Sequence, residues 1–387
     1  LWRYLIINDM KRALAEKGDP NLNLPVRRIM IDPTFKEIIE FIRECRKAGR
    51  FATDLEVINH QVPCFSLCYD PGGMEGLVVP LSDEHGEPFW RLEDERDIWL
   101  EYAAALEDPE VEKVNQNLIG FDMPFLAMQN HILAKGYMCD TMIAQHILYP
   151  EFNKGLDFIA SIHTREPYYK DEGKMWKGMG GDLDEFLIYN GKDACVAMEA
   201  WHALAEEMTE GGYWPSYNLH EQEKEWLMYM TLRGFRVNHE KLQATLTRVN
   251  ADLARKETEL REVAEWDFNP GSPKQCQQYF YGTKGIAPYK GKTGGITTDD
   301  TAMSRIVRRY NLKEAKLVQE IRALRKLKGT YLEVVFDPDD RLRCSYNPRG
   351  TWTGRLSSSE TVFGRGMNMM NLHPEFKEFL VADEVAL

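Results

Sequence analysis

The chain has 387 residues, of which 43% are hydrophobic and 28% charged, and its formal net charge is −13. This length is too great for one small domain and predicts two or three domains. The composition is typical of a globular protein, and no apolar run approaches the roughly 18 residues of a membrane span, which excludes a membrane protein.

The seven cysteines include no Cys-x-x-Cys pair, and the closest two are Cys64 and Cys68. We interpret them as reduced core thiols. No secretory signal precedes the first predicted domain, so we expect a cytoplasmic location, which would be the host cytoplasm if the protein is viral.

The negative charge is unevenly distributed along the chain. From Thr301 to Lys377 there are fifteen Lys or Arg against eight Asp or Glu. Only this segment is suited to a phosphate backbone. The alternative is an ordinary solvated surface, which we favour for Arg308, Arg309 and Lys313 individually.

Residues 1–27 are expected to form a helical extension of unknown role. An α/β pattern follows, with a strand at Arg28 to Ile31, a helix from Thr34 to Lys47 and a second strand from Phe51 to Ile58. Asp54 and Glu56 lie two apart in the second strand. Side chains at this spacing point to the same face of a sheet, so both carboxylates can face one metal site.

The next strand is predicted at Val114 to Ile119, delivering Asn117 and Asp122 to its carboxyl end, with a helix from Met123 to Lys135. Asp182 to Met208 is predicted to be one long helix. Tyr189 and Asp193 lie four apart on it and therefore share a face. A phenol beside a carboxylate could orient an attacking water.

Together Asp54, Glu56, Asp122 and Asp193 can hold two divalent cations, Mg²⁺ or Mn²⁺, which prefer hard oxygen ligands. Two such ions about 3.5–4 Å apart can stabilise both oxygens in phosphodiester hydrolysis, which indicates a nuclease. Any one of these fragments alone is more simply explained as exposed surface, because the chain has 61 acidic residues. The ordered set is more specific than its parts.

Three motifs carry these residues: Asp54-x-Glu56, the stretch from Asn117 to Asp122, and the stretch from Tyr189 to Asp193. They resemble the motifs of the DnaQ-like proofreading exonucleases, of ribonuclease H-like fold, that are fused to family A DNA polymerases. The resemblance covers about Arg28 to Met208, and we expect the exonuclease domain to span residues 28–210. It implies that the four carboxylates ligate two metals, that Tyr189 holds the nucleophilic water and that Asn117 positions the substrate. Trp176 and the Gly-Met-Gly-Gly run after it are expected to form a loop beside this domain that could stack on single-stranded DNA.

The second half also resembles this polymerase family. Residues 216–336 are similar to its mainly helical thumb, and 337–387 to the first strands of its palm. The most specific piece is Thr351-Trp352-Thr353-Gly354-Arg355-Leu356-Ser357-Ser358-Ser359. The resemblance implies contacts to a DNA primer–template through the following residues: Lys326, Lys328, Thr353, Arg355, Ser357, Asn368 and Asn371.

The run after Ser359 departs from the family pattern. Glu360 to Gly366 is apparent extra length, and only Asn368, Asn371 and an aliphatic residue are retained beyond it. The family's metal-binding Asp-x-Ser-Gln would come next in the palm, beyond Leu387. We therefore expect exonuclease activity, and no polymerase activity from this chain alone.

Two alternatives remain open. The chain could be a non-catalytic DNA-binding subunit of a split polymerase, whose partner chain carries the palm and fingers. That hypothesis predicts a large exposed apolar surface near Phe376 to Leu387. The chain could instead be a 3′ exoribonuclease of the same fold, against which the thumb and the Arg355 run argue.

Overall fold

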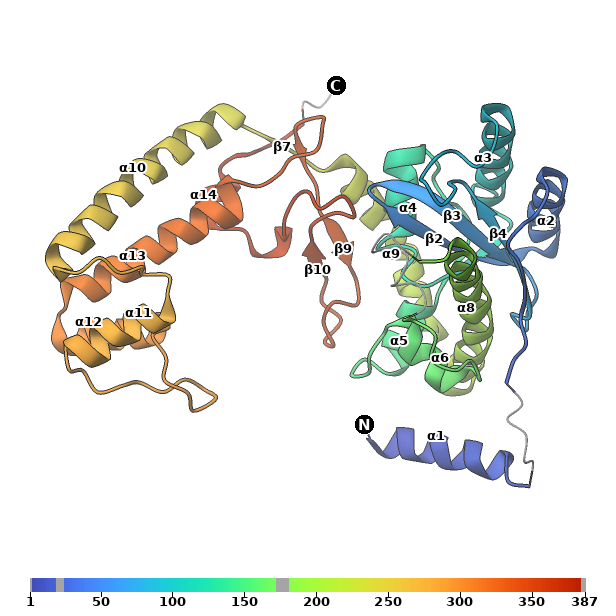
Figure 1. Cartoon of the computed structure of the whole chain (residues 1–387), viewed down its shortest axis with the longest axis horizontal. Helices are drawn as coiled ribbons and strands as arrows, with labels where there is room; N and C mark the ends of the chain where they lie inside the picture. The colour runs from blue at the N-terminus through green and yellow to red at the C-terminus, as the bar shows by residue number, and fades with distance from the viewer. Residues whose placement is uncertain (1, 19–23, 172–180, 384–387) are drawn as a thin grey trace. The chain divides into compact units, whose positions relative to one another are not determined.

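The computed structural model describes residues 2–18, 24–171 and 181–383, and the chain divides into two compact units (Figure 1). The first unit comprises Leu1–Arg233 with Ser345–Ser358, and the second Gly234–Cys344 with Ser359–Leu387. The predicted loop at Trp176 lies outside the described residues. Within the described ranges, no helix combines the length and apolar character needed to cross a bilayer.

The first unit is an α/β structure. Its elements in chain order are α1 (Trp2–Ala15), β1 (Arg28–Met30), α2 (Phe35–Ala48), β2 (Arg50–Ile58), β3 (Gln61–Cys68), β4 (Glu75–Pro80), α3 (Leu92–Leu106), β5 (Glu112–Asn115), α4 (Asp122–Phe125), the π-helix η1 (Leu126–Asn130), β6 (Met138–Asp140), α5 (Thr141–Leu148), α6 (Leu156–His163), α8 (Leu183–Gly211), α9 (Trp214–Arg233), β9 (Ser345–Asn347) and β10 (Ser357–Ser359).

A six-stranded mixed sheet forms the centre of the first unit, with strand order β1-β4-β3-β2-β5-β6. β3 pairs antiparallel with β2 and β4, whereas β1–β4, β2–β5 and β5–β6 are parallel pairs. β3 therefore runs opposite to the other five strands. In the register of β2 and β3, Asp54 lies opposite Ser66.

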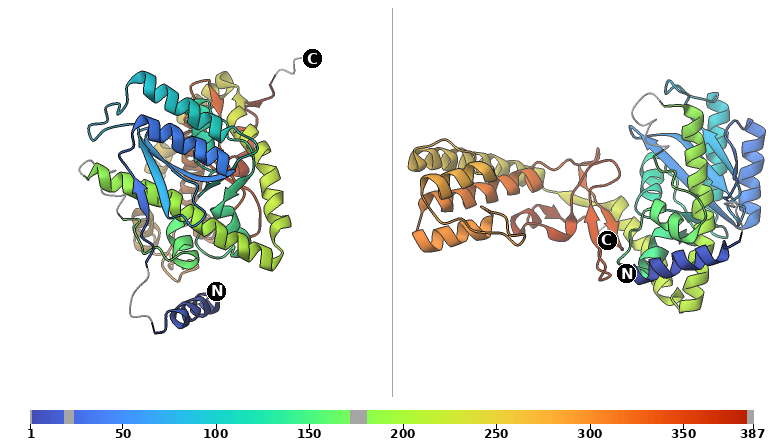
Figure 2. Two further views of the ribbon diagram at one scale, coloured as in Figure 1. Left: turned by 90° about the vertical axis from the view of Figure 1, so that its right-hand side faces the viewer. Right: turned by 60° about the horizontal axis from the view of Figure 1, so that its bottom comes forward.

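The alternation of side chains along β2 separates an apolar face from a carboxylate face. On one face Thr53 hydrogen-bonds to Tyr102 of α3 at 2.7 Å, and the ring of Phe65 stacks on Tyr102 with centroids 4.1 Å apart. On the other face Ser66 donates to the carbonyl of Asn190 in α8 at 2.8 Å. The acidic side chains of β2 thus face α8, while α2 and α3 lie on the opposite face of the sheet (Figures 1 and 2).

Helix α8 packs closely across β2, β3 and β4. Gly191 makes this approach possible, because a Cβ there would lie 2.4 Å from Ile29 Cγ2 and 2.9 Å from Val78 Cγ2. Asp182 caps the start of the helix by accepting from the amide of Asp184. The close packing places the middle of α8, including Asp193, against the carboxylate face.

Most predicted elements of the first unit are confirmed with small shifts in their ends, and two differ. The strand predicted at Val114 to Ile119 ends at Asn115, so Asn117 lies in the turn beyond it. The helix predicted from Met123 to Lys135 is short α4 followed by η1, and residues 131–137 are not helical. His131 ends η1 in the left-handed region, with φ 58°. The seven cysteines are free and buried, as expected.

The second unit is mainly helical. Its elements are β7 (Phe235–Val237), α10 (His239–Ala264), α11 (Pro273–Gln277), the π-helix η2 (Gln278–Thr283), α12 (Asp300–Tyr310), α13 (Lys313–Leu327), the π-helix η3 (Lys328–Leu332), β8 (Arg341–Leu342), the 3-10 helix η4 (Met369–Asn371), α14 (Pro374–Lys377) and β11 (Leu380–Val381). β7 is central in a three-stranded sheet with β8 and β11.

Helix α10 packs along α13, which also packs on α12. Asn238 caps the start of α10 by accepting from the amide of Lys241 at 2.9 Å. The core of this unit includes Phe376 and Phe379, which are fully buried. Because both rings are buried, the described part of this segment, which ends at residue 383, lacks the large exposed apolar surface that the split-subunit hypothesis predicts, although Val381 is 42% exposed.

Candidate active site

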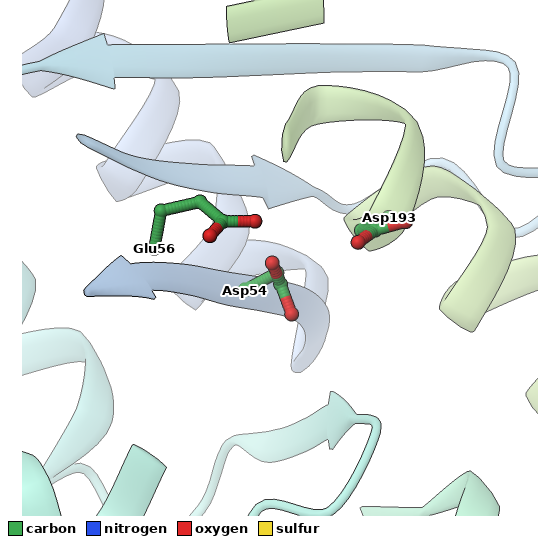
Figure 3. A group of neighbouring side chains, drawn as sticks. All are labelled: Asp54, Glu56 and Asp193. Atoms are coloured by element: carbon green, nitrogen blue, oxygen red, sulfur yellow. The ribbon is translucent and has the colours of Figure 1, made fainter. Parts of the chain in front are cut away.

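Three of the four predicted metal ligands converge between β2 and α8 (Figure 3). Asp54, Glu56 and Asp193 each offer a carboxylate oxygen, and these oxygens lie within 4.8 Å of one another. Glu56 and Asp193 are buried, and Asp54 is partly exposed. Two strand positions on one face and one helix position thus form a compact group of oxygen donors.

Asp122 lies next to this group rather than within it. It is the first residue of α4 and is only 3% exposed. Its Oδ1 has no hydrogen-bond partner among the described residues. Burial raises its pKa to about 8. A buried carboxylate oxygen without a partner beside three other carboxylates suits a bound cation, which would favour its charged form.

The carboxylates act strongly on one another. The pKa of Asp54 is raised well above its ordinary value, first by withdrawal from solvent and then by the negative charges of Asp193, Asp122 and Glu56. Asn190 donates to Asp54 Oδ2 at 2.9 Å and fixes that carboxylate from α8. Because hard oxygen ligands with this mutual repulsion are typical of divalent-cation sites, the residues present fit Mg²⁺ or Mn²⁺.

Tyr189 lies one turn before Asp193 on α8, as the spacing predicts. Its hydroxyl accepts a hydrogen bond from Lys170 Nζ at 3.2 Å. Burial, followed by the charges of Asp193, Glu56 and Asp54, raises the pKa of the phenol. The phenol therefore stays protonated at neutral pH and can orient a water molecule, but it is not a base.

Two neighbours of Asp193 were not predicted. Tyr169 donates to Asp193 Oδ1 at 2.5 Å, and Lys170 Nζ lies 2.6 Å from both carboxylate oxygens. Both residues follow α6 in an irregular segment, where no periodicity or motif indicates a site. Only the tertiary structure places them against α8.

Asn117 is held by a third unpredicted residue, Arg349, whose Nη2 donates to its Oδ1. Asn117 has a left-handed backbone with φ 69°, and its amide donates to Asp140 Oδ1 at 3.2 Å. The Arg349 side chain is only 4% exposed, and its Nη1 lies 4.0 Å from Asp140 Oδ2. The segment that carries Arg349 thus packs into the first unit near the predicted substrate-positioning asparagine.

The run from Thr351 to Arg355 forms an exposed tight turn. The amide of Gly354 donates to the carbonyl of Thr351 at 3.2 Å, and Gly354 has φ 74°, a conformation that glycine adopts without strain. The Thr351 hydroxyl accepts from the Arg355 amide at 2.9 Å. Thr353 and Arg355 are exposed and Ser357 is half-buried, so the first two are available to a ligand.

The other predicted DNA contacts belong to the second unit. Lys326 is exposed near the end of α13, and Lys328 is half-buried with its Nζ 3.5 Å from Glu333 Oε1. Asn368 is exposed, and its side chain caps η4 by accepting from the Met370 amide at 2.9 Å. The carbonyl of Asn371 accepts from Tyr331 at 2.8 Å. The side chain of Asn368 thus has a structural role, whereas the contact of Asn371 is made by its backbone.

The raised pKa of Asp122 predicts that the metal-free protein loses stability as pH rises. The folded pKa of about 8 exceeds the unfolded value of about 3.9, so the neutral carboxyl contributes stability that is lost as pH rises through 8. Between pH 6.5 and 8.5 in chelator, we expect a loss of about 1–2 kcal/mol, measured by thermal unfolding. Asp122→Asn should flatten this slope. Equal slopes for the two proteins would contradict the prediction.

Comparisons with known proteins support the polymerase part of the resemblance seen in the sequence. The family model described as DNA polymerase family A matches residues 239–372. DNA polymerase I of Rhizobium leguminosarum is 30% identical over 352 residues, which cover 83% of this chain and 34% of that protein. The chain belongs to the family A DNA polymerases. The family-model match includes the Arg355 run, and the longer alignment also extends well into the first unit.

Other relatives in the family give the same result. DNA polymerase I of Pseudomonas aeruginosa is 26% identical over 360 residues, which cover 86% of this chain and 38% of that protein. A solved structure, the POL domain of Pol1 from M. smegmatis in complex with DNA primer-template and dNTP, shares the fold, with TM-score 0.67 and 20% identity over 91% of this chain and 57% of that chain. The chain spans about a third of the length of these two curated relatives.

Proposed function

We propose that the first unit is a 3′-to-5′ proofreading exonuclease that hydrolyses the terminal phosphodiester of a DNA strand. The observation that carries this proposal is the convergence of Asp54, Glu56 and Asp193 within 4.8 Å. Asp122 and Tyr189 adjoin this group and complete the set of residues that the reaction requires. Membership of the family A DNA polymerases supports DNA as the substrate.

The arrangement of the sheet supports a ribonuclease H-like assignment. β2 carries two of the acids and lies inside a mixed sheet, with the reversed strand β3 on one side and parallel β5 on the other. Asp122 follows β5, and α8 brings Asp193 across the sheet face. The acids therefore come from separate stretches of sequence, as in the family whose motifs the chain resembles.

Two bound Mg²⁺ or Mn²⁺ ions would supply activation of water and stabilisation of charge at the scissile phosphate. Asp54, Glu56, Asp122 and Asp193 would hold them. Asn190 keeps Asp54 oriented through its hydrogen bond to Oδ2. The protonated phenol of Tyr189 would hold the attacking water in line with the phosphorus, which is an entropic contribution rather than proton transfer.

We also propose that successive segments of the chain form domains with different functions. Residues 28–210 would form the exonuclease domain after an extension at 1–27, residues 216–336 the thumb, and residues 337–387 the start of the palm. The exposed Lys326 and Arg355 would contact phosphates of a primer–template duplex, with Lys328, Thr353, Ser357, Asn368 and Asn371 as further contacts. Phosphate contacts of this kind fix register without reading sequence.

Release of nucleotides from a 3′-labelled single strand tests the proposal. In Mg²⁺ the protein should release labelled mononucleotide from DNA, and chelator should stop the release. A matched RNA strand separates the exoribonuclease alternative, since faster digestion of RNA would favour that function. No release from either strand in Mg²⁺ or Mn²⁺ would overturn both assignments.

Replacing Arg355 with alanine tests the duplex contact separately. Because Arg355 is exposed beside a glycine turn, we expect duplex DNA affinity to fall about tenfold and the slope of log K against log salt to shrink by about one. Fluorescence anisotropy at several salt concentrations measures both. Arg96→Ala, which removes an equally charged exposed side chain from α3, is the control and should leave both values unchanged. Identical slopes for the Arg355 variant and wild type would rule out the contact.

A further inference from the structure

Lys170 is held in the carboxylate site by several independent contacts. Its ammonium nitrogen lies 2.6 Å from both Oδ1 and Oδ2 of Asp193 and 3.2 Å from the Tyr189 hydroxyl. The same nitrogen lies 4.9 Å from the ring centroid of Tyr189 and 5.2 Å from that of Tyr169. A carboxylate and two aromatic rings thus surround one cation, and the Lys170 side chain is only 17% exposed.

The segment that carries Lys170 is itself anchored. Glu166 accepts from Arg27 Nε at 2.7 Å, and both side chains are nearly fully buried. The amide of Glu166 also donates to Thr164 Oγ1 at 3.1 Å. Tyr169 is 3% exposed and bonds to Asp193. These contacts fix the backbone on the approach to Lys170, so the ammonium occupies a built position rather than a surface contact.

The ammonium and a divalent cation need the same atoms. Lys170 contacts both oxygens of Asp193, and Asp193 is one of the three residues whose oxygens converge within 4.8 Å. A lysine ammonium is a compact point charge with three donors, so it can neutralise a carboxylate as a metal ion would. A metal ion on Asp193 would lie close to this positive charge and be repelled by it.

We propose that Lys170 is a built-in competitor for the metal site, occupying one cation position until a divalent ion displaces it from Asp193. This inference rests on the proposed function of the same carboxylates. Displacement would also remove the Lys170 hydrogen bond to the hydroxyl of Tyr189, which could then bind the attacking water. Binding of the metal ion and release of the Tyr189 hydroxyl from Lys170 would thus occur together.

Mn²⁺ titration by calorimetry on the full chain tests the competition. Lys170→Met keeps the length of the side chain and removes its charge, and we expect it to bind Mn²⁺ at least about tenfold more tightly than wild type. Lys47→Met is the matched control, because Lys47 is 76% exposed on α2 and, within the described part of the chain, forms an ion pair only with Glu44. The control should stay within about twofold of wild type. Equal or weaker binding by the Lys170 variant would overturn the proposal.

A second readout uses the wild-type protein and does not depend on how the variant folds. An amine-acetylating reagent followed by mass spectrometry reports the reactivity of Lys170, normalised to Lys47. Mn²⁺ should raise this reactivity several-fold, because the displaced ammonium leaves its carboxylate. Unchanged or lower reactivity at saturating Mn²⁺ would show that metal and Lys170 share the site, and would overturn the proposal.

These outcomes distinguish a failure of the Lys170 competition from a failure of the proposed function. If Mn²⁺ binds and DNA is hydrolysed but neither result depends on Lys170, the competition is wrong and the exonuclease stands. If neither wild type nor the Lys170 variant binds Mn²⁺ or hydrolyses DNA, the proposed function fails, and the competition with it.

Discussion

Replacing Asp54 with asparagine is expected to lower the rate of 3′-end hydrolysis by on the order of 10³-fold. The substitution keeps the shape of the side chain and removes one of the charges that would hold the cations. The negative charges of the other three carboxylates all raise the pKa of Asp54, and Asn190 orients Asp54 by donating to its Oδ2. The rate is measured as mononucleotide release in Mg²⁺ under single-turnover conditions.

A separate measurement distinguishes loss of chemistry from loss of fold. Removing one of several mutually repelling charges should leave the melting temperature in chelator unchanged or higher at pH 8. Asp97→Asn is the control, since it removes an exposed carboxylate from α3, where Asp97 pairs with Arg96. It should retain full activity. Wild-type activity in the Asp54 variant would remove Asp54 from the mechanism.

Replacing Phe65 with alanine is expected to lower the free energy of unfolding of the first unit by about 3–5 kcal/mol. Phe65 is fully buried on β3 and stacks on Tyr102, on the sheet face opposite the carboxylates. Alanine would leave a cavity between the sheet and α3. Phe65→Leu keeps most of the volume and should cost less than about 1.5 kcal/mol.

The measurement must resolve the two units, because a chain of two units need not unfold in a single step. Hydrogen exchange of the β2 and β3 amides in increasing urea reports the first unit specifically. Phe89→Ala is the control, since Phe89 is 44% exposed and lies outside the buried core. A loss for Phe65→Ala no larger than for this control would show that the ring does not contribute to the core.

The local part of the site was predictable from sequence because it depends on short spacings. A spacing of two residues on β2 places Asp54 and Glu56 on one face of the strand. A spacing of four residues on α8 places Tyr189 and Asp193 on one face of the helix. Both predictions depend only on the period of the element. They hold because β2 is largely buried on both faces and α8 has a long buried face, which fixes both elements in the core.

The residues that sequence could not supply are those whose position depends on long-range packing. Lys170 lies in an irregular segment, and Arg349 is 232 residues from the asparagine it contacts. The turn at Asn117 was predicted to be strand, because its left-handed backbone is not encoded by apolar periodicity. The predicted strand through Asn117 and the helix predicted from Met123 to Lys135 both differ from the structure. Both lie at the carboxyl edge of the sheet, where side-chain contacts rather than intrinsic propensity determine the backbone conformation.

The most direct test of the central claim is a crystal structure with Mn²⁺ and a single-stranded DNA whose terminal linkage resists hydrolysis. We expect anomalous density for Mn²⁺ among Asp54, Glu56 and Asp193, with Asp122 completing the ligands and the 3′-terminal phosphodiester beside it. Saturating Mn²⁺ with no anomalous density at these carboxylates, or a DNA 3′ end bound away from them, would contradict it.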